Sequence, residues 1–359
     1  MKISILNLQN NYCDIGCGSI SLSEAARVLS LNGFFVENIF TSFNEKDLSS
    51  VLPSLLKAKP NILIVIGNTA LFAKHTKKDI PDFVEDTLFE IGNMQHILCD
   101  NLTNNFLHEV IVPTIKQKEK KAITVEVYRT FGIEYDTLTE LLAPCIANKA
   151  KIKFEFFRIG HLDYETHIKY AQTAPVGVVE EIRRKTAVAL KPHLYALKSI
   201  DLNELVVEIL QTRKKTVCVA ESFTGGALAA KLVEVEGASA VIKEGLVVYS
   251  NDSKTSRLKI DTKLLKNYGA VSIETVYEMA ALELSQAGAD YVLATTGYAS
   301  APVSTDQTKN AIRGNFFIAV GDSKDIHIHQ HVYAVGTKRQ VMNYGVSQAL
   351  FALYKKLTK

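Results

Sequence analysis

The sequence predicts an α/β protein built from three modules. Short apolar runs rich in Val and Ile alternate along the chain with longer runs of helical periodicity, a pattern typical of strands interleaved with helices. Hydrophobic residues make up 47% of the 359 residues and charged residues 22%, which provides enough apolar surface for packed cores and argues against disorder. Three modules in a chain of this length also agree with ordinary domain sizes.

The first module is expected over residues 1–122. It begins with a strand over residues 1–8, continues with a helix from Ser23 to Asn32, and contains a buried parallel strand from Asn61 to Ile66. A charged run from Lys116 to Lys121 is typical of a solvated connector and marks the end of this module.

The second module is expected over residues 123–195. It contains a helix-like run from Leu138 to Ala143, which we expect to end before Pro144. A second joint falls near Lys191-Pro192-His193, ahead of a helix from Leu202 to Leu210 that leads into the third module.

The third module, residues 196–359, is expected to form an α/β sandwich. Its strands are predicted around Val217, around Val247, from Tyr291 to Thr295 and from Phe316 to Val320. The intervening helices are predicted from Ala227 to Val235, Thr275 to Gln286 and Gln340 to Leu357. Ligands of open α/β sheets bind beyond the strand ends, so we expect a site formed by the loops after the first three strands.

A serine turn is the most informative feature of this module. The stretch Ala220-Glu221-Ser222-Phe223-Thr224-Gly225-Gly226 lies between a strand and a helix. The two glycines let the backbone approach a ligand closely, and the N–H groups that open the helix favour an oxyanion or a phosphate. Ser222 is therefore a candidate nucleophile. The alternative is a serine that only caps the helix.

A base for this serine is available downstream. Tyr249 and Lys254 follow the second strand, and no His is close in sequence. A lysine kept neutral by desolvation, helped by a tyrosine hydroxyl, can take the proton of a serine. The alternative is a solvated loop lysine near a tyrosine at a strand end.

These residues also carry a family resemblance. From about Leu202 to the C-terminus the chain resembles the CinA family (competence/damage-inducible protein A), through AESFTGGALAAKLVEVEGASAVIKEGLVVYSNDSKTSRLKI, Tyr268-Gly269-Ala270-Val271-Ser272 and Thr296-Gly297. The resemblance implies a domain that hydrolyses the carboxamide of nicotinamide mononucleotide (NMN), giving nicotinate mononucleotide and ammonia. It implies no metal and no cofactor. It also implies that Ser222 is the nucleophile and that Tyr249 and Lys254 activate it. The backbone donors that it implies are those of Thr224, Gly225 and Gly226.

The chain departs from this family's pattern where substrate is expected to bind. Phe223 stands where the family usually has Cys, so a larger ring adjoins the nucleophile. The family's TGxAGP loop has lost a glycine and reads Thr296-Gly297-Tyr298-Ala299-Ser300-Ala301-Pro302. Its KPVG element reads Ala311-Ile312-Arg313-Gly314, and its GDR element reads Gly336-Thr337-Lys338-Arg339. Arg313 either binds a phosphate or only occupies the site, and Lys338 lacks the planar fork of Arg. The substrate-binding positions implied here are Thr296, Gly297, Arg313, Lys338 and Arg339.

Three functions remain open at this point. The first is an amidohydrolase that uses Ser222. The second is a catalytically degenerate CinA-like protein that binds a nucleotide or a protein without turnover. The third is hydrolysis of a related amide, with a cavity reshaped by Phe223 and Arg313.

The first module resembles, more faintly, the molybdopterin-binding-like half of long CinA proteins, and the segment from Tyr128 to Ile133 resembles their small linker domain. Where that half carries paired aspartates, this chain has Lys74 and His75. Basic groups repel Mg²⁺ and do not coordinate it. We therefore expect the family's ADP-ribose pyrophosphatase activity to have been lost.

Composition argues against several partners. The net charge is +3, without a basic stripe that carries interleaved aromatics, which argues against nucleic acid. A signal peptide and a membrane-length apolar stretch are both lacking, so we expect no membrane partner and a cytoplasmic location. The resemblance implies a small pyridine nucleotide as ligand and a homodimer.

The sequence does not favour a metal site. The five cysteines are typical of reduced thiols, and Cys13 with Cys17 lacks a second pair of ligands at suitable spacing. His327, His329 and His331 alternate along a strand and share one face, but collinear side chains do not close easily around one ion. We expect that face to be partly solvated.

Overall fold

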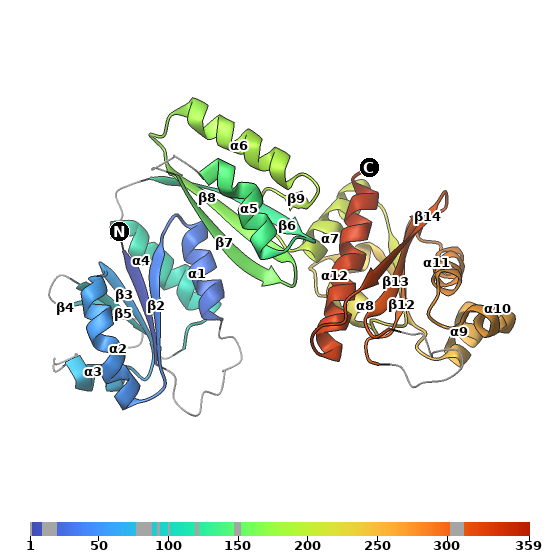
Figure 1. The fold of residues 1–359 in the computed structure, drawn as a ribbon, viewed down its shortest axis with the longest axis horizontal. Helices are drawn as coiled ribbons and strands as arrows, with labels where there is room; N and C mark the ends of the chain where they lie inside the picture. The colour runs from blue at the N-terminus through green and yellow to red at the C-terminus, as the bar shows by residue number, and fades with distance from the viewer. Residues whose placement is uncertain are drawn as a thin grey trace. The chain divides into compact units, whose positions relative to one another are not determined.

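The computed structural model describes residues 2–8, 20–76, 88–91, 94–99, 101–118, 122–146, 152–301 and 312–359. The chain forms two compact units, which combine Met1–Tyr128, Glu134–Gly160 and Tyr164–Pro192 in unit 1 and Arg129–Ile133, His161–Asp163 and His193–Lys359 in unit 2. Strands and helices alternate in both units (Figure 1), which confirms the predicted α/β class. The division into three modules stays a prediction.

The first sheet lies in unit 1 and has the strand order β2-β1-β3-β5-β4. Its central pairings are parallel, and β4 is antiparallel to β5. The strands are β1 (Ile3–Leu8), β2 (Val36–Ser42), β3 (Ile62–Gly67), β4 (Leu88–Ile91) and β5 (Met94–Cys99). The helices are α1 (Leu22–Leu31), α2 (Glu45–Ala58), α3 (Thr69–Thr76), the π-helix η1 (Phe106–Ile111) and α4 (Val112–Lys118).

Alternation along β1 builds a core on each face of this sheet. Ile3 and Ile5 pack with α1, η1 and α4, while Leu6 and Leu8 pack with α2 and α3. All four side chains are at most 2% exposed, so β1 is a fully buried central strand. The three elements predicted in this module are confirmed to within two residues of their observed bounds.

A second sheet has the strand order β7-β8-β6-β9. Its strands are β6 (Ile123–Phe131), β7 (Ile152–Gly160), β8 (Asp163–Ala171) and β9 (Leu194–Ala196), and its helices are α5 (Tyr135–Ile146) and α6 (Val176–Leu190). The prediction that the helix ends before Pro144 was wrong, because α5 continues through it. Leu142 and Cys145 are buried, and their burial holds the last turn although proline removes one backbone hydrogen bond.

The third sheet lies in unit 2 and has the order β11-β10-β12-β13-β14. Its strands are β10 (Val217–Glu221), β11 (Ile242–Val247), β12 (Tyr291–Gly297), β13 (Asn315–Asp322) and β14 (Ile326–Val332). The helices are α7 (Leu202–Arg213), α8 (Ala227–Val233), the 3₁₀ turn η2 (Ala238–Ala240), α9 (Asn251–Leu258), α10 (Thr262–Tyr268), α11 (Ile273–Ala287) and α12 (Lys338–Leu357).

Helices cover both faces of this sheet (Figure 1). Val217 and Val219 of β10 pack with α7, α8 and α12, while Cys218 and Ala220 pack with α9, α10 and α11. The predicted α/β sandwich is confirmed. The chain adds helices α9 and α10 that the hydrophobic pattern did not predict.

Strand direction decides where a site can form in this unit. β10 is parallel to β11 and β12, whereas β13 is antiparallel to β12. The carboxyl ends of β10, β11 and β12 therefore meet at one edge of the sheet. The loops that leave this edge carry Ser222, Tyr249 and Tyr298.

In the part of the chain that the structure describes, no helix combines the length and the apolar composition that crossing a membrane requires.

Candidate active site

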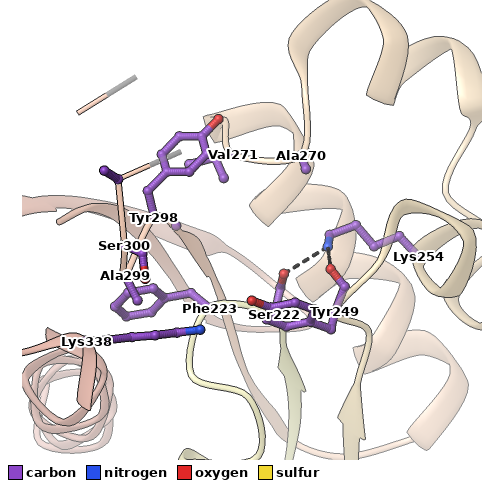
Figure 2. A pocket seen from close by; sticks show the side chains of 12 residues that line it. Ser222, Phe223, Tyr249, Lys254, Ala270, Val271, Tyr298, Ala299, Ser300 and Lys338 are labelled. Atoms are coloured by element: carbon purple, nitrogen blue, oxygen red, sulfur yellow. Dashed lines mark hydrogen bonds between the residues drawn. The ribbon is translucent and has the colours of Figure 1, made fainter. Parts of the chain in front are cut away.

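A cavity of about 330 Å³ opens at this edge of the third sheet. Figure 2 shows its lining side chains, which come from the loops after β10, β11 and β12, from helix α9, from the α10–α11 loop, and from the first turn of α12. The lining residues are Ser222, Phe223, Tyr249, Lys254, Ala270, Val271, Gly297, Tyr298, Ala299, Ser300, Ala301 and Lys338. The gathering of three strand-end loops agrees with the expectation from the sequence.

Ser222 and Lys254 are in direct contact. Lys254 Nζ lies 2.9 Å from Ser222 Oγ and 3.3 Å from the Tyr249 carbonyl oxygen (Figure 2). It also lies 2.8 Å from the Val248 carbonyl oxygen. Lys254 is fully buried, and this burial lowers its pKa from 10.5 to about 8. The solvated-lysine alternative is therefore excluded for this structure.

The three contacts of Lys254 allow both protonation states. An ammonium group donates to all three oxygens. A neutral amine keeps two N–H groups for the Val248 and Tyr249 carbonyls, and its lone pair then faces the hydroxyl of Ser222. Because the pKa is about 8, about a tenth of the amine is neutral at pH 7 and about half at pH 8.

Helix α9 places this lysine. Ser250 caps the helix, and its side chain accepts from the Ser253 amide at 3.0 Å while Ser253 Oγ accepts from the Ser250 amide at 3.0 Å. This reciprocal cap starts α9 directly after the β11 loop. Lys254 then lies one turn inside the helix, and its side chain points back toward Ser222.

The backbone of the serine is held by neighbouring strands. The Ser222 amide donates to the Thr295 carbonyl of β12 at 2.9 Å, and the Val248 amide donates to the Glu221 carbonyl at 2.7 Å. Ser222 is 8% exposed and lines the cavity. Its hydroxyl is therefore fixed between the cavity and the lysine.

Glu221 has a role that the sequence analysis missed. Its fully buried carboxylate accepts hydrogen bonds from the amides of Gly226, Leu228 and Ala229, at 2.9, 3.0 and 2.7 Å. The carboxylate thus occupies the N-terminus of α8, where the sequence analysis expected a bound anion. A Glu at the end of an apolar strand, directly before the serine, was the available signal.

This arrangement changes the set of backbone donors. The Gly226 amide, expected to serve the substrate, donates to Glu221 instead. The Thr224 hydroxyl is paired with Thr295 Oγ1 at 2.7 Å. Among the described residues, no partner is found for the amides of Phe223, Thr224 and Gly225. These three consecutive amides follow Ser222 directly.

Tyr249 contributes differently from the expectation. Its carbonyl accepts from Lys254, while its side chain is 65% exposed and lines the cavity. The described residues include no hydrogen-bond partner for its hydroxyl. The structure therefore places the tyrosine at the cavity without a hydrogen bond between its hydroxyl and the serine.

Two glycine-loop residues support the cavity wall. Gly297 lies so close to β13 that a Cβ there would be 2.3 Å from the Cβ of Phe316, which excludes any side chain. Thr296 is fully buried, and its hydroxyl donates to the Ala270 carbonyl at 2.6 Å. Thr296 thus supports Ala270, which lines the cavity, without lining it itself.

The cationic positions divide into two groups. Lys338 is exposed at the first position of α12 and lines the cavity. Arg313 donates to the Gly336 carbonyl and Arg339 is exposed, and neither belongs to the lining. Of the predicted residues, the cavity brings together Ser222, Tyr249, Lys254, Gly297 and Lys338. It does not include Thr224, Gly225, Gly226, Thr296, Arg313 or Arg339.

A Ser–His–Glu arrangement lies in unit 1. Ser30 Oγ is 2.6 Å from His167 Nδ1, and His167 Nε2 is 2.7 Å from Glu165. All three side chains are at most 2% exposed, and the Ser30 hydroxyl donates to Glu155. A serine whose proton is committed to a carboxylate and that solvent cannot reach is not a nucleophile, so this arrangement is structural.

The described residues contain no group of three or more His, Cys, Asp or Glu side chains suited to a metal ion. The predicted histidine strand is confirmed as β14, and its expected solvation is confirmed because His327 and His329 are exposed. Cys13 and Cys17 lie outside the described residues. Lys74, one of the basic residues in place of the aspartates, pairs with Glu45 at 2.9 Å.

A family model and several known proteins are similar in sequence to this chain. Residues 199–357 match the family model described as the CinA C-terminal domain. A relative from Thermoanaerobacter pseudethanolicus, named for competence-damage induction, is 32% identical over 192 residues, which are 53% of this chain and 46% of that relative. A CinA-like protein from Endomicrobium trichonymphae is 27% identical over 94% of this chain and 81% of its own length.

A solved structure was also matched. It is a competence-damaged protein (CinA) superfamily protein from Klebsiella pneumoniae, 30% identical, with a TM-score of 0.41, covering 44% of this chain and 96% of that chain. The chain therefore spans about half of the length of one curated relative and nearly the whole of a shorter solved one.

Proposed function

The chain belongs to the CinA family, and from this premise we propose that it hydrolyses the carboxamide of NMN to nicotinate mononucleotide and ammonia. The observation that carries the proposal is the contact between Ser222 and Lys254. A buried lysine with a pKa of about 8, at 2.9 Å from a serine hydroxyl in a cavity, has the geometry and the basicity that a serine nucleophile requires.

Acylation starts from the neutral amine of Lys254. The Ser222 oxygen attacks the carboxamide carbon while its proton passes to Lys254 Nζ, and the carbonyl electron pair moves onto oxygen. Of the three amides without a partner among the described residues, only that of Phe223 belongs to a residue that lines the cavity, and it is the donor available to this oxyanion. The intermediate then expels the nitrogen, which takes the proton from Lys254 and leaves as ammonia.

Deacylation uses the same lysine. Water gives a proton to Lys254 and attacks the acyl carbon, and the Ser222 oxygen then leaves with that proton. One water is consumed, and one carboxylic acid and one ammonia are formed. The positive pyridinium ring of the substrate withdraws electrons from the carboxamide, which makes its carbon a better electrophile.

The remaining lining residues suit a mononucleotide. The volume of about 330 Å³ lies in the range of small-molecule sites. Tyr249 and Tyr298 offer aromatic surface to a cationic ring, and the Lys338 ammonium offers a positive charge to a phosphate.

A catalytically degenerate, nucleotide-binding protein is the second candidate. The observation that favours it concerns two cations that the sequence analysis assigned to substrate binding, of which only Lys338 lines the cavity. Lys338 replaces a planar arginine by a point charge, and Arg313 is committed to the Gly336 carbonyl. A loosely oriented carboxamide would bind without turnover.

The test is ammonia release from NMN by the full chain, with calorimetric binding of NMN measured in parallel. Ser222→Ala and Lys254→Met are expected to abolish release, and Ser256→Ala on the exposed side of α9 serves as the matched control. Undiminished release by the Ser222 variant would contradict the assigned nucleophile. Binding without release by the unmodified protein would favour the degenerate candidate.

We also propose that unit 1 has no ADP-ribose pyrophosphatase activity, because Lys74 and Glu45 already form an ion pair where a metal site would need uncompensated carboxylates. Release of AMP from ADP-ribose with Mg²⁺ would contradict this. Light scattering tests the proposed homodimer, and cell fractionation tests the proposed cytoplasmic location.

A further inference from the structure

The ring that follows the nucleophile is enclosed by two other elements of unit 2. Phe223 is 3% exposed, and its ring stacks on Phe316 of β13 with a centroid distance of 4.7 Å and an interplanar angle of 8°. The Phe316 ring also contacts the rings of His331 and Tyr344, at centroid distances of 5.2 and 6.0 Å. The Phe223 ring therefore rests on a rigid aromatic stack.

The opposite contact is made possible by a glycine in α12. A Cβ at Gly345 would lie 2.2 Å from Phe223 Cε1 and 3.0 Å from Cζ, which no real side chain tolerates without movement. Gly345 lies inside a regular helix and has no positive φ, so its backbone conformation does not require glycine. Glycine destabilises a helix interior relative to alanine, so the space for the ring is the feature that explains it.

Ser222 is thus anchored from two directions. On one side its amide bonds to β12, and on the other the side chain of the next residue is packed between β13 and α12. The turn that follows contains Gly225 and Gly226, both with positive φ, and neither residue has a side chain that could pack and hold the turn in place. Displacement of the turn would lengthen the 2.9 Å contact between Ser222 and Lys254.

We propose that Phe223 is a positioning residue, which holds Ser222 Oγ against Lys254 Nζ by packing its ring into the space above Gly345. The expected effect on NMN hydrolysis rests on the proposed amidohydrolase function. The packing of Phe223 against Gly345 does not depend on that function. The ring contributes no atom to the reaction. It fixes the distance over which the serine proton must move.

The test combines four proteins: the unmodified chain, Phe223→Ala, Gly345→Ala and the double variant. Urea unfolding measures stability. Gly345→Ala is expected to destabilise the protein when Phe223 is present, because the new methyl meets the ring. In the Phe223→Ala background the same change is expected to stabilise it, because alanine is the better helix residue.

Activity is read in two ways. The rate of Ser222 phosphonylation by a fluorophosphonate probe, followed by intact mass, needs no assumption about the substrate. Phe223→Ala is expected to slow this rate by about tenfold or more, and to lower kcat for NMN by a similar factor with KM nearly unchanged. Phe223→Leu, which refills part of the space, is expected to recover part of both rates.

Each failure is distinguishable. Labelling of Ser222 that depends on Phe223, without ammonia release from NMN, would refute the proposed substrate and support the positioning role. A folded Phe223→Ala variant with the original labelling rate would overturn the positioning role, as would the absence of coupling between the two substitutions. Failure of the unmodified chain to be labelled would overturn both, since Ser222 would not be an activated nucleophile.

Discussion

Replacement of Lys254 by methionine tests the central electrostatic feature of the site without any substrate. Methionine keeps an unbranched side chain of similar length and removes the titrating amine. In the folded chain burial lowers the pKa of Lys254 to about 8, whereas an unfolded chain has the ordinary value of 10.5. Since one pKa unit corresponds to about 1.4 kcal/mol, the burial costs about 3 kcal/mol of stability when both states are protonated.

The pH window follows from these two pKa values. Below about pH 7 the lysine is protonated in both states, so the full cost is present and constant. Above pH 8 the folded state loses the proton while the unfolded state keeps it until about pH 10.5, so the stability of the unmodified protein rises with pH. Between pH 7 and pH 9.5 about 2 kcal/mol is recovered.

The assay is urea unfolding of both proteins at several pH values in this range. The chain has no Trp, so far-UV circular dichroism is the suitable signal. The difference in unfolding free energy, unmodified minus Lys254→Met, is expected to increase by about 2 kcal/mol toward pH 9.5. Loss of the bonds to the Val248 and Tyr249 carbonyls adds an offset that does not depend on pH.

A difference that stays constant across the range would refute the reasoning. It would show that Lys254 keeps an ordinary pKa in the folded chain and remains an ammonium at neutral pH. The lone pair required for deprotonating Ser222 would then be absent, and the proposed mechanism would lose its base.

Three further predictions follow from the same unit. The value of kcat/KM for NMN hydrolysis is expected to rise about tenfold per pH unit below pH 8 and to level off above it, because only the neutral amine of Lys254 acts as base. A profile that is flat from pH 6 to pH 9 would contradict this. Glu221→Gln is expected to lower the urea midpoint by an amount equivalent to about 2 kcal/mol, because three amides lose a buried carboxylate as their acceptor. A midpoint within error of the original would show that these three hydrogen bonds contribute little to stability. Gly297→Ala is expected to prevent stable folding of unit 2, since the methyl would meet β13, so a soluble variant with an unchanged circular dichroism spectrum would disprove the close approach.

The elements that the sequence predicted well have a strong local pattern. The helix predicted from Thr275 to Gln286 is observed as Ile273–Ala287, and the strand predicted from Tyr291 to Thr295 as Tyr291–Gly297. Helix α9 was missed because its segment Asn251–Leu258 is almost entirely polar and has no hydrophobic period. Its start depends instead on the reciprocal cap of Ser250 and Ser253.

By itself the sequence determined the α/β class, the position of Ser222 at a strand-to-helix turn, and the candidacy of Lys254, because hydrophobic periods and turn residues act over short distances along the chain. Only the tertiary structure decided that Lys254 is buried against Ser222, that Glu221 occupies the helix N-terminus, and that Gly345 makes room for Phe223. Desolvation, hydrogen bonding and steric contact depend on which distant segments meet in space, and sequence spacing does not specify those meetings.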